Sequence, residues 1–140
     1  MTPTPPIPKG GIVARLVAIE DSPVLQRLLA LTMRDTSIEI DPYLDGSGGL
    51  EAALANPPDL IVLDLGLPDM SGWQVLERLR ADPATLGVPV VITTGETRGS
   101  TANRAATLDA VTLEKPYTAA VLRSTILMLV DTRSVAESMS

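Results

Sequence analysis

The stretch that decides the fold is LIVLDLGLPDMSG, residues 60–72, in which an apolar run ends at Asp64 and a turn-forming segment follows. A short, continuous apolar run bounded by turn residues is typical of a buried strand in a parallel sheet. Ligands of such sheets bind beyond the carboxyl ends of the strands, so Asp64 is a candidate functional residue. An ionised carboxylate beside Leu, Ile and Val loses hydration, and it therefore needs positive or hydrogen-bonding partners.

The composition predicts one domain with an aliphatic core. The chain has 140 residues, of which 45% are hydrophobic and only 2% aromatic. Residues 1–11 are rich in proline, which disfavours a helix or a central strand, and we expect a disordered tail there. The folded domain is expected over residues 12–131, followed by a short polar tail at 132–140.

The residue types that are missing exclude several kinds of site. The chain has no cysteine and no histidine, which excludes disulfides, thiolate metal sites and imidazole chemistry. A net charge of -6 argues against non-specific binding to nucleic acid. No apolar stretch approaches the roughly 20 residues that cross a bilayer. We therefore expect a cytoplasmic protein without a nucleic-acid or membrane partner.

Strand-like and helix-like segments alternate along the chain. The strands are expected at residues 13–19, 38–40, 60–65, 89–93 and 110–114. This alternation predicts an α/β fold with a five-stranded parallel sheet and helices on both faces.

The helix boundaries follow from capping signals. Ser22 and Pro23 predict an N-cap with proline in the first turn, and the spacing then places five residues on one helical face: Val24, Leu25, Leu28, Leu29 and Thr32. Later helices are expected at residues 50–55, after a capping box at residues 71–74, and from Thr118 to about Asp131. The segment 95–109 has few apolar anchors, and its helix is expected to be short or mobile.

Polar residues stand where several of these strands end. Glu20 and Asp21 follow the first strand, Asp64 ends the third, Thr94 the fourth, and Lys115 follows the fifth. The three carboxylates repel one another by on the order of several kcal/mol in a partly buried site, so the cluster needs a cation. Hard oxygen ligands of this kind suit Mg²⁺.

Lys115 strengthens this interpretation. Lys9 and Lys115 are the two lysines of the sequence, and every other basic residue is arginine. A compact ammonium contacts a carboxylate or a phosphoryl oxygen as a point charge. Taken alone, Lys115 is as well explained as a surface lysine before a proline turn, but its position beside Asp64 and Thr94 favours a functional role.

Four segments together resemble the receiver domain of bacterial two-component response regulators. They are residues 20–21, LIVLDLGLPDMSGW at 60–73, PVVITTG at 89–95 and EKPY at 114–117, and the similarity covers about residues 13–130. The resemblance implies a flavodoxin-like (βα)5 fold, a three-layer sandwich with strand order 2-1-3-4-5.

The resemblance also implies a phosphoacceptor site. Asp64 would accept a phosphoryl group from a phosphohistidine of a sensor histidine kinase or a phosphotransfer protein. Thr94 would donate its hydroxyl to one phosphoryl oxygen, and Lys115 would pair with another. Such a protein is a switch of protein contacts that dephosphorylates itself, rather than an enzyme with a dedicated substrate.

The same resemblance implies a ligand set for Mg²⁺. Asp21, Asp64 and the backbone carbonyl of Gly66 would bind the ion, and Glu20 would act through a bound water. Glu20 stands where the family more often has aspartate, one methylene shorter.

A second departure concerns the signalling device of the family. Thr112 lies three residues before Lys115, where many receivers carry an aromatic residue that moves with the threonine. The usual switch is therefore expected to be missing, with signalling through loop order around residues 95–100 instead. Tyr117 lies beyond the lysine and does not simply substitute.

The segment after residue 130 and the last helix suggest how the protein passes on its signal. Beyond residue 130 there is only a short polar segment, so we expect a stand-alone receiver that acts through an unidentified protein target. The last helix is apolar on more than one face, which leaves Val121, Leu127 and Met128 toward its flanks or outside. A homodimer through this helix is expected, and a broadly buried helix is the alternative.

Two other functions are alternatives to the receiver. A phosphohydrolase of the haloacid-dehalogenase type also uses a strand-end aspartate, but it needs a second aspartate two residues on, where this chain has Gly66. A degenerate receiver that serves only as a binding module stays open because of Thr112. The intact site residues disfavour it, namely Asp21, Asp64, Thr94 and Lys115.

Overall fold

The computed structural model describes residues 14–96 and 99–139, so the expected N-terminal tail lies outside the described residues. The strands are β1 (Ala14–Ile19), β2 (Ile38–Tyr43), β3 (Leu60–Asp64), β4 (Val90–Thr94) and β5 (Val111–Glu114). The helices are α1 (Pro23–Met33), α2 (Gly46–Ala55), α3 (Gly72–Ala81), α4 (Ser100–Thr107) and α5 (Ala119–Met139).

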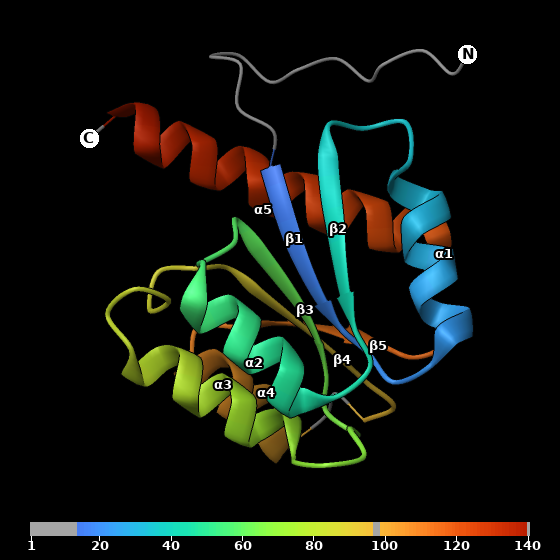
Figure 1. Ribbon diagram of the computed structural model, residues 1–140, viewed down its shortest axis with the longest axis vertical. Helices are drawn as coiled ribbons and strands as arrows, with labels where there is room; N and C mark the ends of the chain where they lie inside the picture. Colours follow the sequence, from blue (N-terminus) through green and yellow to red (C-terminus); the bar gives the residue numbers. More distant parts are fainter. Residues whose placement is uncertain (1–13, 97–98, 140) are drawn as a thin grey trace.

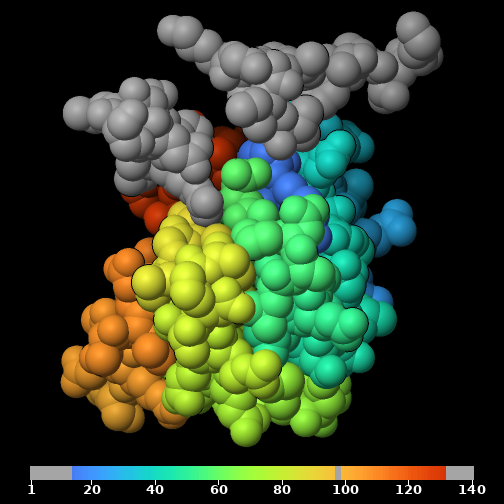
Figure 2. All heavy atoms as spheres, turned by 60° about the vertical axis from the view of Figure 1, so that its left-hand side comes forward, coloured from blue at the N-terminus to red at the C-terminus, as the bar shows by residue number. Residues whose placement is uncertain are grey.

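The five strands form one parallel sheet, as the sequence pattern predicted, and their order β2-β1-β3-β4-β5 is the one that the resemblance to receiver domains implied. Helices α1 and α5 cover one face of the sheet, and α2, α3 and α4 cover the other (Figure 1). Figure 2 shows the second face, where atoms of α2, α3 and α4 lie side by side, coloured from green to orange. The fold is therefore the expected three-layer α/β sandwich.

Two hydrophobic cores lie on the two faces of the sheet. Along β1, Leu16 and Ala18 point into the core under α1 and α5, whereas Val17 and Ile19 point into the core under α2 and α3. This alternation is the two-residue period of a strand that is covered on both faces. All five residues of β3 are buried, so this central strand is enclosed by both cores.

Helix α1 begins as predicted but presents a different face to the core. The Ser22 hydroxyl accepts a hydrogen bond from the Leu25 amide, and Pro23 is the first helical residue. The buried residues are Gln26, Leu29 and Met33, spaced i, i+3 and i+7, and Val24 is 75% exposed. The predicted face was wrong for Val24, because a polar residue, Gln26, occupies the buried position.

Helix α2 begins at Gly46, four residues before the expected start. Asp45 is its N-cap and accepts a 2.7 Å hydrogen bond from the Gly48 amide. The glycine-rich segment 46–49 looks like a loop because glycine weakens helices. In α2 the Asp45 cap and the hydrogen bonds from the Gly46 and Ser47 amides to Asp69 outweigh the low helix propensity of these glycines.

Helices α3 and α4 follow the prediction. The capping box of α3 is present, because the Ser71 amide donates to Gln74 Oε1 at 3.0 Å while the Ser71 hydroxyl accepts from the Trp73 amide. Helix α4 is short, and Ala105 is its buried residue.

The guanidinium of Arg80 ties the end of α3 to the loops around it. It donates to the backbone carbonyls of Leu108 (2.8 Å) and Asp109 (3.1 Å) at the α4–β5 turn. It also donates to carbonyls in the α3–β4 loop, with a 2.8 Å bond to Val88. Burial lowers the pKa of Arg80 from its ordinary value.

Helix α5 is longer than expected. Its first turn is capped by Thr118, whose hydroxyl accepts from the Val121 amide at 3.1 Å, as predicted. The helix continues to Met139 rather than ending near Asp131. No glycine or proline follows Pro116 in the sequence, so nothing local stops it. None of the helices within the described residues is long and apolar enough to span a bilayer.

Candidate functional site

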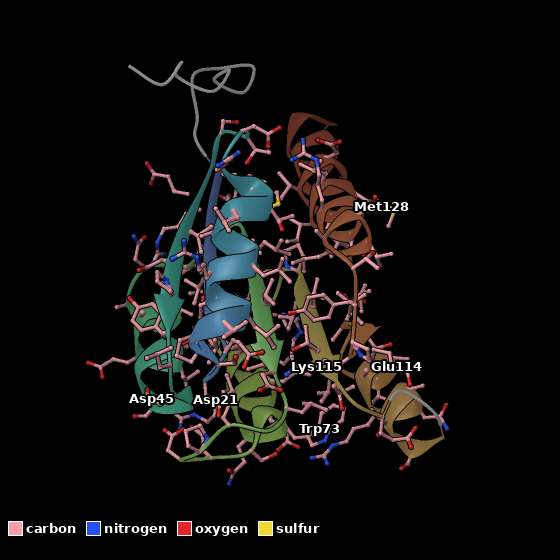
Figure 3. The ribbon with its side chains drawn as sticks, turned by 90° about the vertical axis from the view of Figure 1, so that its right-hand side faces the viewer. Asp21, Asp45, Trp73, Glu114, Lys115 and Met128 are labelled. Carbon is pink, nitrogen blue, oxygen red and sulfur yellow. The ribbon has the colours of Figure 1, made fainter. Side chains whose placement is uncertain are left out.

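The candidate site lies at the carboxyl edge of the sheet, where the predicted polar residues meet. Asp64 and Thr94 are the last residues of β3 and β4, Glu20 follows β1, and Lys115 follows β5. The Lys115 amide donates a 2.8 Å hydrogen bond to the Thr94 carbonyl, which joins the ends of β4 and β5. Figure 3 shows Asp21 and Lys115 toward the same end of the sheet, with Met128 at a distance on α5.

Three carboxylates converge in this site. Oxygen atoms of Glu20, Asp21 and Asp64 lie within 4.8 Å of one another. Glu20 and Asp64 are each 5% exposed, whereas Asp21 is open to solvent. Glu20 Oε1 is buried and faces the Lys115 ammonium at 3.1 Å. Three clustered carboxylates, two of them buried, carry more negative charge than one ammonium balances, and they fit a hard divalent cation such as Mg²⁺.

Lys115 bridges the two buried carboxylates. Its Nζ lies 3.1 Å from Glu20 Oε1 and 3.2 Å from Asp64 Oδ1. Burial disfavours the charged ammonium, but the hydrogen bond with Glu20 and the charges of Glu20 and Asp64 outweigh it and raise the pKa of Lys115. The lysine is therefore protonated at neutral pH and neutralises part of the negative charge.

Glu20 is the most perturbed acid of the site. Burial raises its pKa to about 7, against hydrogen bonds from the Ser22 amide and from Lys115 that favour the charged form. The charge of Asp64 adds to the rise. Burial is thus the main reason why Glu20 holds a proton more strongly than an ordinary glutamate.

Asp64 is held in place by the segment that follows it. The Gly66 amide donates to Asp64 Oδ1 at 3.1 Å, so the hydrogen bond from Gly66 and the ion pair with Lys115 share one oxygen. Gly72, the first residue of α3, lies against the backbone of Asp64, and a Cβ there would stand 2.6 Å from the Asp64 carbonyl oxygen. Only glycine allows α3 to start so close to β3.

Gln26 supports the site from α1, and the sequence interpretation missed it. Its side-chain amide donates to the backbone carbonyls of Ala18 (2.9 Å), Glu20 (3.1 Å) and Tyr43 (3.1 Å). It therefore joins the end of β1, which carries Glu20, to the end of β2. The i, i+3, i+7 spacing of Gln26, Leu29 and Met33 was the signal that would have found it.

Thr94, Thr112 and Tyr117 complete the surroundings of the site. The Thr94 hydroxyl accepts a 3.2 Å hydrogen bond from the Glu96 amide, in the turn after β4. Thr112 is half-buried in β5, beside Ile92 of β4. Tyr117 packs against the core under α1 and α5, and burial together with the charge of Glu20 raises its pKa. The aromatic residue near the site thus follows Lys115 rather than preceding it.

Trp73 connects α3 to α4. The Arg104 guanidinium of α4 lies over its indole ring, 4.5 Å from the ring centroid, and it also pairs with Glu77 of α3. Trp73 also packs against the core under α2 and α3. It is therefore a packing residue.

The comparisons with known proteins agree with this geometry. The sequence model of the response regulator receiver domain matches residues 16–127. The chain belongs to this family. The matched range includes the six positions whose roles stay a prediction: Glu20, Asp21, Asp64, Gly66, Thr94 and Lys115.

The curated relatives of this receiver are longer proteins. It is 38% identical over 85 residues to the transcriptional regulatory protein KdpE of Mycobacterium tuberculosis, a match that covers 61% of this chain and 36% of KdpE. It is 39% identical over 83 residues to the DNA-binding response regulator MtrA of Mycolicibacterium smegmatis, covering 59% of this chain and 35% of MtrA. The match thus spans about a third of these relatives.

Solved receiver structures share the fold. The chemotaxis response regulator CheY4 of Vibrio cholerae superposes with a TM-score of 0.78 at 24% identity, over 84% of this chain and 99% of that one. The receiver domain of a sensor histidine kinase of Pseudomonas aeruginosa superposes with a TM-score of 0.76 at 21% identity, over 86% and 99% of the chains. That structure holds a magnesium ion in its active-site cleft.

Proposed function

We propose that this receiver accepts a phosphoryl group on Asp64 in a Mg²⁺-dependent reaction, and thereby switches its contacts with other proteins in two-component signal transduction. The observation that carries the proposal is the meeting of three carboxylates and one ammonium at the end of the central strand. Within this cluster Asp64 is the last residue of β3, and its Oδ1 lies 3.2 Å from Lys115 Nζ.

The proposed step is the transfer of a phosphoryl group between two carriers. An oxygen of the Asp64 carboxylate forms a bond to phosphorus while the bond from phosphorus to the donor breaks, and the donor leaves with the electron pair. Because the transition state is loose, the protein contributes position and charge more than covalent chemistry. The Lys115 ammonium balances charge on one phosphoryl oxygen, and the Thr94 hydroxyl donates to another.

The carboxylates of the cluster would also hold the metal ion. Asp21, Asp64 and the carbonyl of Gly66 are the proposed ligands, and Glu20 would act through a water molecule. A bound Mg²⁺ offsets the repulsion among the carboxylates and the charge of the phosphoryl oxygens. The acyl phosphate on Asp64 is a mixed anhydride, so we expect the protein to hydrolyse it slowly and reset itself.

The donor is proposed to be a sensor histidine kinase or a phosphotransfer protein, and the output a protein contact. The names of KdpE and MtrA describe transcriptional or DNA-binding regulators, and the match spans about a third of their length. The expectations of a stand-alone receiver without a nucleic-acid partner therefore stay predictions. A cytoplasmic location likewise stays a proposal that follows from this function.

Incubation with acetyl phosphate and Mg²⁺, followed by intact mass measurement, tests the proposed function. We expect an added mass of about 80 Da, the mass of one phosphoryl group, that decays on removal of the donor. Asp64→Asn should abolish the adduct, and Asp131→Asn, an exposed aspartate on α5, should leave it unchanged. An unmodified wild-type protein would favour the degenerate binding module, and rapid turnover of many phosphate esters would favour a phosphohydrolase.

We also propose that two copies associate through α5. Leu122 and Ile126 are buried against the sheet, while Val121 and Met128 are 48% and 61% exposed. Leu127, expected toward the flanks or outside of the helix, is partly buried and packs against the core under α1 and α5. Met128→Lys should reduce the hydrodynamic size of the protein, and Leu86→Lys, in the exposed loop after α3, should leave it unchanged. A Met128→Lys variant of unaltered size would rule out this dimer.

A further inference from the structure

The loop between β3 and α3, residues 65–71, is fastened to the first turn of α2 by one side chain. Asp69 Oδ1 accepts a 2.8 Å hydrogen bond from the Gly46 amide, and Asp69 Oδ2 accepts a 2.9 Å bond from the Ser47 amide. Each carboxylate oxygen thus holds one backbone amide of a helix that is distant in sequence. Figure 1 shows this loop running beside the N-terminal end of α2.

These two bonds use donors that the helix itself leaves unpaired. The first amides of a helix have no partner within it, and they attract negative charge. The N-cap of α2, Asp45, takes the Gly48 amide, and Asp69 takes the two amides before it. The hydrogen bonds from Gly46 and Ser47 lower the pKa of Asp69, so the carboxylate is ionised at neutral pH.

Apolar contacts fit the loop to the same turn. A Cβ at Gly46 would stand 2.6 Å from Met70 Cγ and 3.2 Å from Leu67 Cδ1. Both side chains come from the loop, and a larger residue at position 46 would require the Met70 side chain to move. The contact between the loop and α2 is therefore a close-packed one, with Asp69 as its charged centre.

The other end of the loop lies in the candidate site. Gly66, three residues before Asp69, donates its amide to Asp64 Oδ1 at 3.1 Å. The loop is therefore fixed at one end to Asp64 and at the other to α2. The segment between these two anchors carries both the Gly66 amide and the Gly66 carbonyl.

We propose that Asp69 is a positioning residue that sets the backbone of Gly66 against Asp64 and so shapes the metal and phosphoryl site. The part of this inference that concerns Mg²⁺ rests on the proposed function. The part that concerns the Gly66 backbone holds for the metal-free protein and is measured separately.

The test compares Asp69→Ala with Asp45→Ala. Both changes remove a carboxylate that accepts hydrogen bonds from amides in the first turn of α2. Of the two residues, only Asp69 belongs to the loop and joins it to that turn. The first readout is the amide proton chemical shift of Gly66 in the metal-free protein. The second is Mg²⁺ affinity, followed by Trp73 fluorescence, and the third is the rate of adduct formation with acetyl phosphate.

For Asp69→Ala we expect the Gly66 amide shift to move toward its value in an unstructured chain, and Mg²⁺ binding to weaken roughly fivefold to tenfold, the effect of losing about one hydrogen bond. Asp45→Ala should leave the Gly66 amide shift in place and the Mg²⁺ affinity within about twofold of the wild type. Asp69→Asn keeps one acceptor oxygen, so its Gly66 shift and its Mg²⁺ affinity should lie between those of the wild type and Asp69→Ala. This variant replaces Asp69→Ala in the test if the alanine variant does not fold.

Equal effects of Asp69→Ala and Asp45→Ala would overturn the proposal, because they would show that Asp69 acts only by stabilising α2. The proposal would also be overturned if the Gly66 amide proton chemical shift were the same in Asp69→Ala as in the wild type. If the wild-type protein neither binds Mg²⁺ nor forms an adduct, the proposed function fails, and the Gly66 shift still decides the positioning role.

Discussion

Nζ of Lys115 lies 3.1 Å from Oε1 of Glu20, so side chains that follow β5 and β1 meet across the ends of the two strands between them. This ammonium meets a carboxylate that is 5% exposed and whose pKa is raised to about 7. A buried acid with such a pKa is partly protonated near neutral pH. The protonation of Glu20 therefore links the stability of the fold to pH and to the binding of a cation.

The metal-free protein should become less stable as the pH rises from about 5 to about 8. Glu20 binds its proton more strongly in the folded chain, where its pKa is about 7, than in the unfolded chain, where it is 4.5. The stability from this proton is fully present below the unfolded pKa and is lost as the pH rises through the folded one, by on the order of 1–3 kcal/mol. Urea unfolding in EDTA measures it.

Glu20→Gln should remove most of this pH dependence, because the amide does not titrate. The control is Glu51→Gln, an exposed glutamate on α2, which should keep it. If the slope persists in Glu20→Gln, another group is responsible for it.

Mg²⁺ should stabilise the protein more at about pH 8 than at about pH 5.5. A ligand that binds only the folded state at 100 times its dissociation constant adds about 2.7 kcal/mol, or roughly 10 °C in the melting temperature of a domain of this size. At the lower pH the protonation of Glu20 competes with the cation. Thermal melting with and without EDTA checks this, and Asp64→Asn should lose most of the effect.

Replacing Gln26 should destabilise the fold. Gln26→Leu preserves the volume of the side chain but removes the donor to the carbonyls of Ala18 and Glu20. Gln26 Oε1 has no partner among the described residues, so its removal offsets part of the loss, and we expect a net cost of about 1 kcal/mol.

Urea unfolding of Gln26→Leu beside Gln74→Leu measures this cost. Gln74 is exposed and contributes to the capping box of α3, so its loss should cost less. A Gln26→Leu variant as stable as the wild type would show that the three carbonyl contacts add nothing to the net stability.

Removing Arg104 should expose the indole of Trp73. The guanidinium covers one face of the ring, so Arg104→Ala should increase quenching of the single tryptophan by acrylamide while changing the free energy of unfolding by less than about 1 kcal/mol. Arg78→Ala, on the exposed side of α3, is the control and should leave quenching unchanged. Unaltered quenching in Arg104→Ala would mean that the stacked arrangement is not populated in solution.

The sheet and the residues at its carboxyl edge could be predicted because short-range patterns determine them. The apolar run at 60–63 is long enough for a strand and too short for a helix, and the alternation of such runs with helical segments leads to a parallel sheet. In a parallel sheet all strand ends of one kind share an edge. The placement of Glu20, Asp64 and Lys115 at one edge therefore follows from chain order, and their contact depends on the strand order and on the length of the lysine side chain.

The parts that could not be predicted depend on contacts between distant segments. The start of α2 at Gly46 needs Asp69, which is 23 residues away, to accept its first amide. The burial of Gln26 needs carbonyls from the ends of two strands, and local hydrophobicity does not reveal them. The end of α5 was placed too early because a decline in apolar residues after Val130 was taken as the end of the helix, although helix-forming residues continue.

The position of β3 in the middle of the sheet has a mechanical consequence. Leu63 pairs in register with Ile19 of β1 on one side and with Ile92 of β4 on the other, and the Leu65 amide still bonds to the Thr93 carbonyl just beyond the strand. Asp64 thus ends a strand that is paired on both sides up to Leu63, and it is itself paired with Thr93 of β4. A chemical change at the Asp64 carboxylate is therefore expected to move neighbouring side chains and connecting loops, because both neighbouring strands hold the backbone of β3 in place.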